Sequence, residues 1–258
     1  MITYQSVLDF WHAKNITSAA QLSEALNAHC ISFAYNSGKL ENDEITYHDT
    51  REVFERDEVT AYTGNLRTLF EIRNSKTAYE YMLDAFDKKL ALDEAFIKEL
   101  QRLLTENTYD KRRWELGERP GEYKKHDYVT GAAEIGASAD EVGEEMNELL
   151  CELGGIDDKN ALTAAAYFHV KFENIHPFAD GNGRAGRLAM NYFLLSHSHP
   201  PIVIHEEDRK AYYAALEAWD NAQELNPMLA FLKEQTIKTW EKQLSKTDNK
   251  TSLKDYLS

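Results

Sequence analysis

A single twelve-residue stretch, His176–Arg187, gathers side chains that could handle a metal-bound polyphosphate. It reads His-Pro-Phe-Ala-Asp-Gly-Asn-Gly-Arg-Ala-Gly-Arg. His176 suits proton abstraction from a weak nucleophile, because histidine ordinarily titrates near neutrality. Asp180 is a hard oxygen ligand of the kind that Mg²⁺ prefers, and Arg184 and Arg187 carry forked donors that match phosphate geometry. We therefore predict a phosphate site with a base beside it.

Two alternatives compete for the same stretch. Residues 181–186 also fit G-x-G-x-x-G, the dinucleotide fingerprint, which has meaning only after a strand. Residues 161–173 are alanine-rich with apolar side chains at helical spacing, so a helix precedes the glycines and this alternative is disfavoured. The other alternative is a glycine-rich helix start whose charges only cap and solvate. It is disfavoured because four such polar side chains crowded into one turn are costly without a ligand.

The stretch resembles the complete signature of the Fic family, H-x-F-x-[DE]-G-N-G-R-x-x-R, without a departure. The resemblance extends over residues 36–232. It implies a mainly α fold, a Fic-type helical bundle with a small β-hairpin flap over the active site. It also implies a protein adenylyltransferase, which transfers AMP from ATP to a Ser, Thr or Tyr hydroxyl of a target protein and releases pyrophosphate.

The resemblance assigns a role to each signature residue. His176 is the expected general base, Phe178 fixes the loop from the core, and Asp180 holds Mg²⁺. The phosphate-binding residues are expected to be Gly181, Asn182 and Gly183 as the anion-binding turn, Arg184 on a phosphate and Arg187 on the terminal one. The Doc-like kinases of the same family depart at the Asp-Gly-Asn-Gly segment, and its integrity here favours AMP transfer.

A second motif lies near the N-terminus. Ser37-Gly-Lys-Leu-Glu41-Asn42 matches [ST]-x-x-x-E-[GN], the inhibitory motif of one Fic class. Residues 20–40 are expected to form a helix that Asn42 ends in the left-handed conformation. Glu41 then sits in the last turn, where the macrodipole disfavours a carboxylate. By resemblance it pairs with Arg187 and blocks the terminal phosphate, in cis or in trans. The same site could instead remove AMP from a protein, with Glu41 orienting a water.

A third segment, residues 121–131, alternates aromatic, basic and β-branched side chains between glycines, which favours a short hairpin. In Fic proteins the corresponding flap covers the nucleotide and docks the target by strand addition. The expected flap residues are Tyr123, Lys124, Tyr128 and Val129. Family members often carry arginine where this chain has Lys124, which keeps the charge and loses the planar fork.

The adenine pocket is expected along a helix of residues 208–222. Tyr212 or Tyr213 could line the base. Asp220, followed by Asn221, stands where some relatives place an asparagine against adenine. A carboxylate accepts from the exocyclic amine but donates to no ring nitrogen. The donor is therefore expected to be ATP, with another nucleotide as the alternative.

Composition limits the partners. The net charge of −15 argues against a nucleic-acid partner and against binding to an anionic membrane. The sequence begins without the basic and apolar regions of a signal peptide, and Cys30 and Cys151 lie far apart. We therefore expect a cytoplasmic protein with free thiols. Fic relatives often dimerise, so a homodimer is a further expectation from the resemblance.

Helical patterns dominate the chain. The predicted helices span residues 6–13, 20–40, 50–56, 59–70, 76–89, 92–105, 139–153, 160–173, 185–196, 209–222 and 227–244. Residues 1–90 are expected to form an N-terminal regulatory region that contains the inhibitory helix. Residues 91–245 are then the catalytic core, and residues 246–258 a polar tail.

Overall fold

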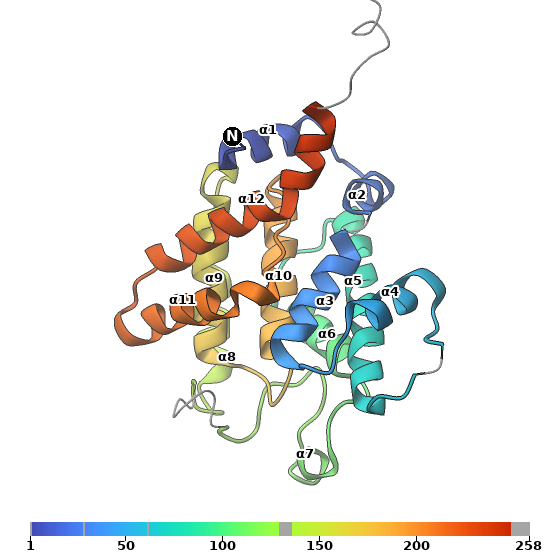
Figure 1. Ribbon diagram of the computed structural model, residues 1–258. Helices are drawn as coiled ribbons and strands as arrows, with labels where there is room; N and C mark the ends of the chain where they lie inside the picture. Colours follow the sequence, from blue (N-terminus) through green and yellow to red (C-terminus); the bar gives the residue numbers. More distant parts are fainter. Residues whose placement is uncertain (1, 28, 61, 129–135, 249–258) are drawn as a thin grey trace, which may run out of the picture.

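The computed structural model describes residues 2–27, 29–60, 62–128 and 136–248 (Figure 1). Within these ranges the regular structure is helical and contains no strand. The helices are α1 (Tyr4–His12), α2 (Ala19–Leu26), α3 (His29–Glu41), α4 (Tyr47–Arg56), α5 (Leu66–Lys88), α6 (Glu94–Thr105), α7 (Lys111–Glu115), α8 (Val142–Glu152), α9 (Ala161–Ile175), α10 (Asn182–Ser196), α11 (Arg209–Ala222) and α12 (Asn226–Asp248), with short 3₁₀ turns η1 (Asp158–Asn160) and η2 (Glu206–Asp208).

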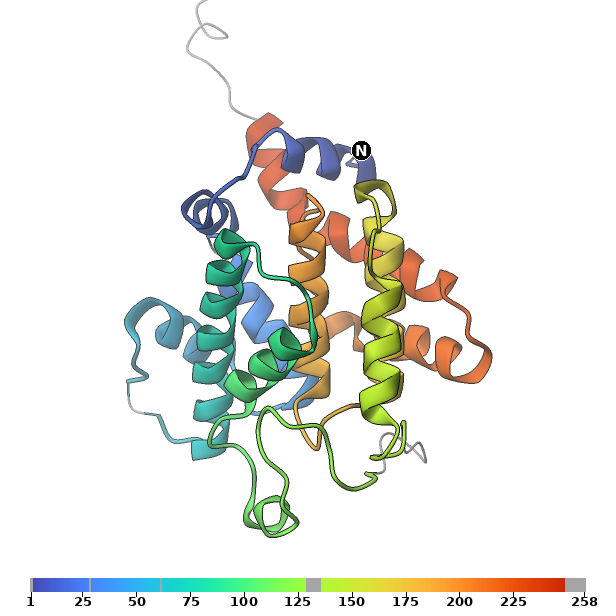
Figure 2. The same cartoon turned by 180° about the vertical axis from the view of Figure 1, so that it is seen from behind.

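Helix α10 forms the centre of the molecule. Both views place it between α9 on one side and α3 and α5 on the other (Figures 1 and 2). Nearly all of its residues are buried, from Asn182 to Leu195. A helix that is buried on every side must satisfy its polar side chains internally. The buried Arg184 and Arg187 of α10 therefore have to find partners on neighbouring helices.

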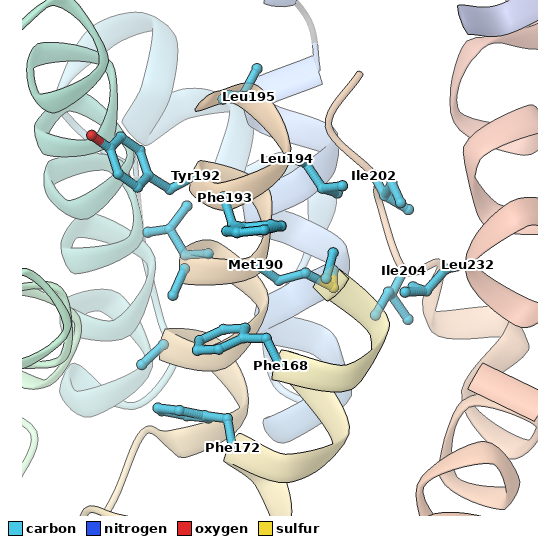
Figure 3. Packing of buried hydrophobic residues seen from close by; sticks show 14 of the residues in the cluster. Phe168, Phe172, Met190, Tyr192, Phe193, Leu194, Leu195, Ile202, Ile204 and Leu232 are labelled. Atoms are coloured by element: carbon cyan, nitrogen blue, oxygen red, sulfur yellow. The ribbon is translucent and has the colours of Figure 1, made fainter. Parts of the chain in front are cut away.

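The core around α10 is built from large apolar side chains. Phe168 and Phe172 of α9 are fully buried and lie beside Met190 of α10 (Figure 3). On the far side, Trp240 of α12 is fully buried, and its indole Nε1 donates to the Pro201 carbonyl at 2.8 Å. Such packing makes α9 and α10 a rigid support for the loop between them.

The predicted regulatory and catalytic regions share one hydrophobic core. Val7, Leu22 and Leu40 belong to the same buried cluster as the side chains of α9 and α10. Helix α12 continues to Asp248, so the first residues of the predicted tail, 246–248, are helical. No helix in the described part of the chain is long and apolar enough to span a membrane.

Three of the predicted helices are wrong in extent. The single helix expected over residues 20–40 is two helices, α2 and α3. Helix α2 ends because Asn27 leaves the helical conformation, with φ 25° and ψ −110°. The two helices expected over residues 59–70 and 76–89 are replaced by one, α5, which begins after its N-cap Asn65. Asn74, which lies between the two predicted helices, is buried in α5, and its side-chain amide donates to the carbonyl of Glu106 at 2.7 Å.

The predicted hairpin flap is not seen. Residues 121–128 contain no strand, and residues 129–135, including Val129, lie outside the described residues. The carboxylate of Glu118, only 1% exposed, organises the segment instead. It accepts from the Lys125 amide at 3.1 Å, from the Tyr128 hydroxyl at 2.8 Å, and lies 3.0 Å from Nδ1 of His126. The donors in this segment thus converge on one side chain rather than on a neighbouring strand. Helix α7 was not predicted.

Candidate active site

The signature loop runs from the end of α9 to the start of α10. His176 caps α9 in the left-handed conformation, with φ 50°, and its amide donates to the Phe172 carbonyl at 3.0 Å. Gly181 caps the start of α10 with φ 80°, a conformation that glycine adopts without strain. The loop is therefore short and closed at both ends, which brings His176 to the positive end of the α10 macrodipole.

Asn182 holds the loop in shape. Its Oδ1 accepts from the Phe178 amide and its Nδ2 donates to the Phe178 carbonyl, both at 2.8 Å. The Phe178 ring is fully buried and lies 5.4 Å from the ring of Tyr123. Phe178 thus occupies the core position expected from the sequence. The Asn182 side chain is engaged with the loop itself, so any anion contact at this residue falls to its backbone.

His176 is set up as a neutral imidazole. Burial and, to a smaller extent, the charge of Lys124 lower its pKa to about 4, although Glu41 and Asp180 act in the opposite direction. At neutral pH the ring is therefore uncharged and can accept a proton. The amide of the same Lys124 donates to the Pro177 carbonyl at 2.9 Å, which anchors the segment before residue 129 against the signature loop.

Asp180, the predicted metal ligand, is surrounded by arginines. Its Oδ2 accepts from Nη2 of Arg67 at 2.7 Å, and its Oδ1 accepts from Nη2 of Arg184 at 3.4 Å. Arg113 of α7 follows at 3.9 Å, and Gln101 of α6 donates to the Asp180 carbonyl. Three of these partners, which come from three other helices, were not predicted from the sequence: Arg67, Arg113 and Gln101.

The side chains around Asp180 offer few oxygen ligands for Mg²⁺. Across the described ranges, no three His, Cys, Asp or Glu side chains converge on one point that could hold a metal ion. Mg²⁺ commonly binds one or two carboxylates and completes its shell with water and substrate phosphates. A single carboxylate, Asp180, fits a cation that arrives with a polyphosphate and does not fit a resident protein-only cage.

Arg187 is bound by helix α3. Its guanidinium is almost fully buried and donates to Oε1 of Glu41 at 2.7 Å, to the Ser37 carbonyl at 2.9 Å and to the Ser37 hydroxyl at 3.0 Å. Burial works against its charge, but Glu41 and the nearby hydroxyl of Tyr212 outweigh burial and raise the Arg187 pKa. Gly183 permits this approach, because a Cβ at that position would overlap Oε1 of Glu41.

Arg184 is also buried and largely held by protein groups. Besides Asp180, its Nη1 reaches the Leu104 carbonyl at 3.4 Å and lies 4.0 Å from Oε1 of Glu71. Its Nε is buried without a hydrogen-bond partner. These long contacts satisfy the guanidinium only in part, which leaves it able to accept a stronger anionic partner.

Asn42 corrects one detail of the inhibitory motif. Glu41 is the last residue of α3, as predicted, but Asn42 does not take the left-handed conformation. Its side chain donates to Oε2 of Glu71 at 2.7 Å and to the Thr68 hydroxyl at 3.1 Å, while its Oδ1 accepts from the Glu44 amide. Asn42 therefore ends the helix through side-chain bonds to α5.

The predicted adenine residues divide into two groups. Tyr212 is 1% exposed, and its hydroxyl lies between Arg187, at 3.3 Å, and Nε2 of His169, at 2.8 Å. The ring is therefore enclosed by this network, and a role of Tyr212 beside the base stays a prediction. Tyr213 is 44% exposed, and its hydroxyl points to the Leu40 carbonyl at 3.5 Å. Asp220 accepts from Asn174 at 2.8 Å, and Asn221 is exposed.

Comparisons with known proteins agree with this geometry. Residues 91–194 match the sequence profile of the Fic/DOC family. The protein adenylyltransferase Fic of Drosophila persimilis is 43% identical over 75 residues, which is 29% of this chain and 15% of that protein. The protein of the same name from Aedes aegypti is 40% identical over the same length. The chain thus corresponds to only about 15% of the length of these curated relatives.

Solved structures extend the likeness to nearly the whole chain. A Fic domain containing signalling protein from Bacteroides thetaiotaomicron aligns over 92% of this chain and 94% of its own, with 28% identity and a TM-score of 0.77. Fic-1 of C. elegans aligns over 96% of this chain and 72% of its own, with a TM-score of 0.78, and at 20% identity it supports the fold alone. The signature loop, its supporting helices and these matches agree, and the chain carries a domain of the Fic/DOC family.

Proposed function

We propose that the chain is a self-inhibited protein adenylyltransferase, which transfers AMP from ATP to a Ser, Thr or Tyr hydroxyl of a target protein. One observation carries the proposal. A neutral His176, the carboxylate of Asp180 and two buried arginines converge at the start of α10, and one of these arginines is occupied by Glu41. The curated relatives named as protein adenylyltransferases support the same reaction.

The chemistry follows from the arrangement. His176 accepts the proton of the target hydroxyl while the hydroxyl oxygen forms a bond to the α-phosphorus. The bond from the α-phosphorus to the bridging oxygen breaks, and pyrophosphate leaves with that electron pair. Mg²⁺, held by Asp180 and the phosphates, would neutralise charge on the leaving group. Arg184 and Arg187 provide fixed positive charge for the phosphates, so catalysis depends mainly on positioning and electrostatics.

Self-inhibition has a direct physical basis. A terminal phosphate that binds Arg187 has to replace the carboxylate of Glu41, which lies 2.7 Å from its Nη2. The two anions repel one another, so Glu41 forces the phosphate chain into another pose. The inhibitory helix and Arg187 belong to the same chain here, which supports inhibition in cis.

One observation favours a second activity. The Glu41 side chain is 36% exposed although its partner is buried, so its free oxygen can reach solvent. A carboxylate at this place could orient a water toward an AMP-modified residue and so remove AMP. The carboxylate of Asp220 also keeps open a donor other than ATP. Target docking by strand addition at residues 121–131 and a homodimer stay predictions.

The deciding experiment is incubation with α-labelled ATP and Mg²⁺. Three proteins are compared for label on protein: wild type, Glu41→Gly and Glu41→Gly/His176→Ala. Strong labelling of only the single variant supports AMP transfer, the inhibitory role of Glu41 and the need for His176. If none of the three labels itself or the proteins of a host lysate, transfer of AMP is contradicted. If wild type, and neither variant, then releases AMP from an AMP-modified substrate, removal of AMP is established.

A further inference from the structure

A continuous series of contacts connects the inhibitory motif to Asp180. Nδ2 of Asn42 donates to Oε2 of Glu71 at 2.7 Å. Oε1 of Glu71 accepts from Nε of Arg67 at 3.0 Å. Nη2 of Arg67 then donates to Oδ2 of Asp180 at 2.7 Å. Glu71 is 5% exposed, so this carboxylate has no solvent alternative and fixes the guanidinium between two acids.

Arg67 pairs with Glu71 of the same helix, four residues further along. Arg67 is nonetheless the second residue of α5, where the macrodipole disfavours a cation. Glu41 has the corresponding problem, since it is a carboxylate in the last turn of α3. Each charge is further stabilised by a partner in the signature stretch, Asp180 for Arg67 and Arg187 for Glu41.

The contact at Asp180 conflicts with metal binding. Mg²⁺ needs a carboxylate oxygen at about 2.0–2.1 Å. Oδ2 already faces a guanidinium at 2.7 Å, and Oδ1 faces Arg184 at 3.4 Å. A divalent cation and the Arg67 guanidinium cannot occupy the same side of Oδ2, because the two like charges would be in contact. A metal ion that binds Oδ2 on this side therefore requires Arg67 to move away.

We propose that Arg67, fixed through Glu71 by Asn42, competes with Mg²⁺ for Asp180. The inhibitory motif then acts twice, through Glu41 on the phosphate arginine and through Asn42 on the metal carboxylate. This inference rests on the proposed function, because it assumes that Asp180 carries the metal that accompanies the nucleotide.

The test measures binding rather than turnover. The probe is an ATP analogue with a methylene group between the α- and β-phosphorus, titrated calorimetrically at a series of Mg²⁺ concentrations. Mn²⁺ binding in the presence of the same analogue, followed by electron paramagnetic resonance, gives a second readout. The background is Glu41→Ala, since alanine keeps the last turn of α3 helical while it removes the first restraint.

Arg67→Ala is expected to lower the Mg²⁺ concentration for half-maximal binding by about fivefold, the size expected for loss of one partly exposed ion pair. Asn42→Ala is expected to act in the same direction but less, because Glu71 still holds Arg67. Arg67→Lys keeps the charge, loses the fork that bridges both acids, and should lie between. Arg73→Ala, an exposed arginine on the same helix, is the matched control and should change nothing.

The outcomes separate cleanly. An unchanged Mg²⁺ requirement in Arg67→Ala would overturn the competition, and a raised requirement would make Arg67 a ligand of the phosphates instead. Either result leaves the proposed function standing, since the analogue still binds. If no variant binds the analogue at any metal concentration, the proposed function itself fails, and this inference fails with it. Thermal melting of each variant confirms that the fold is retained.

Discussion

Arg187 is almost fully buried, whereas Glu41, which accepts from it at 2.7 Å, is 36% exposed. Burying a guanidinium is costly unless its charge is paired and its donors are satisfied. Glu41 neutralises a cation that the fold has removed from water. Under the proposed function Glu41 also obstructs a phosphate, and a substrate phosphate and Glu41 are then alternative anions for one buried cation.

The first prediction concerns stability. Glu41→Gln should lower the free energy of unfolding by about 1–3 kcal/mol, because a buried cation keeps its hydrogen bonds to Ser37 but loses its charged partner. Inorganic tripolyphosphate should then raise the melting temperature of the variant more than that of wild type. Differential scanning fluorimetry with and without the anion measures both effects. Glu80→Gln, an exposed residue on α5, is the control. Equal stabilisation of both proteins would show that the anion does not replace Glu41.

The second prediction concerns Ser37. Its hydroxyl accepts from Nε of Arg187 at 3.0 Å, while its carbonyl accepts separately from Nη2. Ser37→Ala removes only the first bond, and a hydrogen bond to a charged group contributes about 1.5–3 kcal/mol. We expect label transfer from ATP several-fold above wild type and below Glu41→Gly. Ser32→Ala on the same helix should behave as wild type. A Ser37→Ala protein as inactive as wild type would mean that Glu41 and the carbonyl suffice for inhibition.

Local sequence was enough to predict the centre of the site. The Ala-rich pattern of α9, the glycines before α10 and the spacing of the signature all lie within one helix–loop–helix unit. Their geometry follows from helix propensity and from the cap at Gly181. The resemblance to the inhibitory motif added the proximity of Glu41 to Arg187, and the ion pair is present.

The missed residues depend on tertiary contacts. No local sequence pattern marks Arg67 or Arg113, because their partner Asp180 is distant in the sequence. Glu118 is not marked either, because its donors lie in an irregular segment. The bonds of the Tyr212 hydroxyl to Arg187 and His169 could not be predicted either, because an aromatic residue on a helix gives no indication of which groups its hydroxyl meets. The end of α2 at Asn27 has no clear sequence signal either, because asparagine can adopt a positive φ but does so at only some positions.

The third prediction concerns His176. Burial, together with the charge of Lys124, lowers its pKa to about 4, so the base is already neutral well below pH 6. In the nucleotide-free protein, the midpoint of the His176 titration should therefore lie below the usual pKa range of histidine. Lys124→Gln should raise the pKa, because it removes a nearby positive charge. Nuclear magnetic resonance of the histidine ring carbons over pH 3–8 measures both.

Lys125→Gln, a half-exposed neighbour, is the control for His176, and it should leave the titration unchanged. A His176 pKa near 6.5 in wild type would contradict the burial of the ring. A Lys124→Gln protein with the wild-type pKa would show that the lysine charge is screened from His176.

The last prediction concerns Glu173 of α9, whose Oε1 is buried without a hydrogen-bond partner. Burial, opposed by Arg187 and assisted by Glu41 and Asp220, raises its pKa to about 8. The folded protein therefore holds a proton between about pH 4.5 and 8 that the unfolded chain releases, so stability declines as pH rises through this range.

Glu173→Gln removes this decline, and the stability of the variant relative to wild type should grow by up to about 1.4 kcal/mol per pH unit. Urea unfolding at pH 5, 6, 7 and 8 measures the difference, with the exposed Glu148→Gln of α8 as the flat control. Because a buried glutamine amide can cost a constant amount, the slope is decisive rather than the offset. A difference that stays constant from pH 5 to 8 would mean that Glu173 ionises normally in the folded protein.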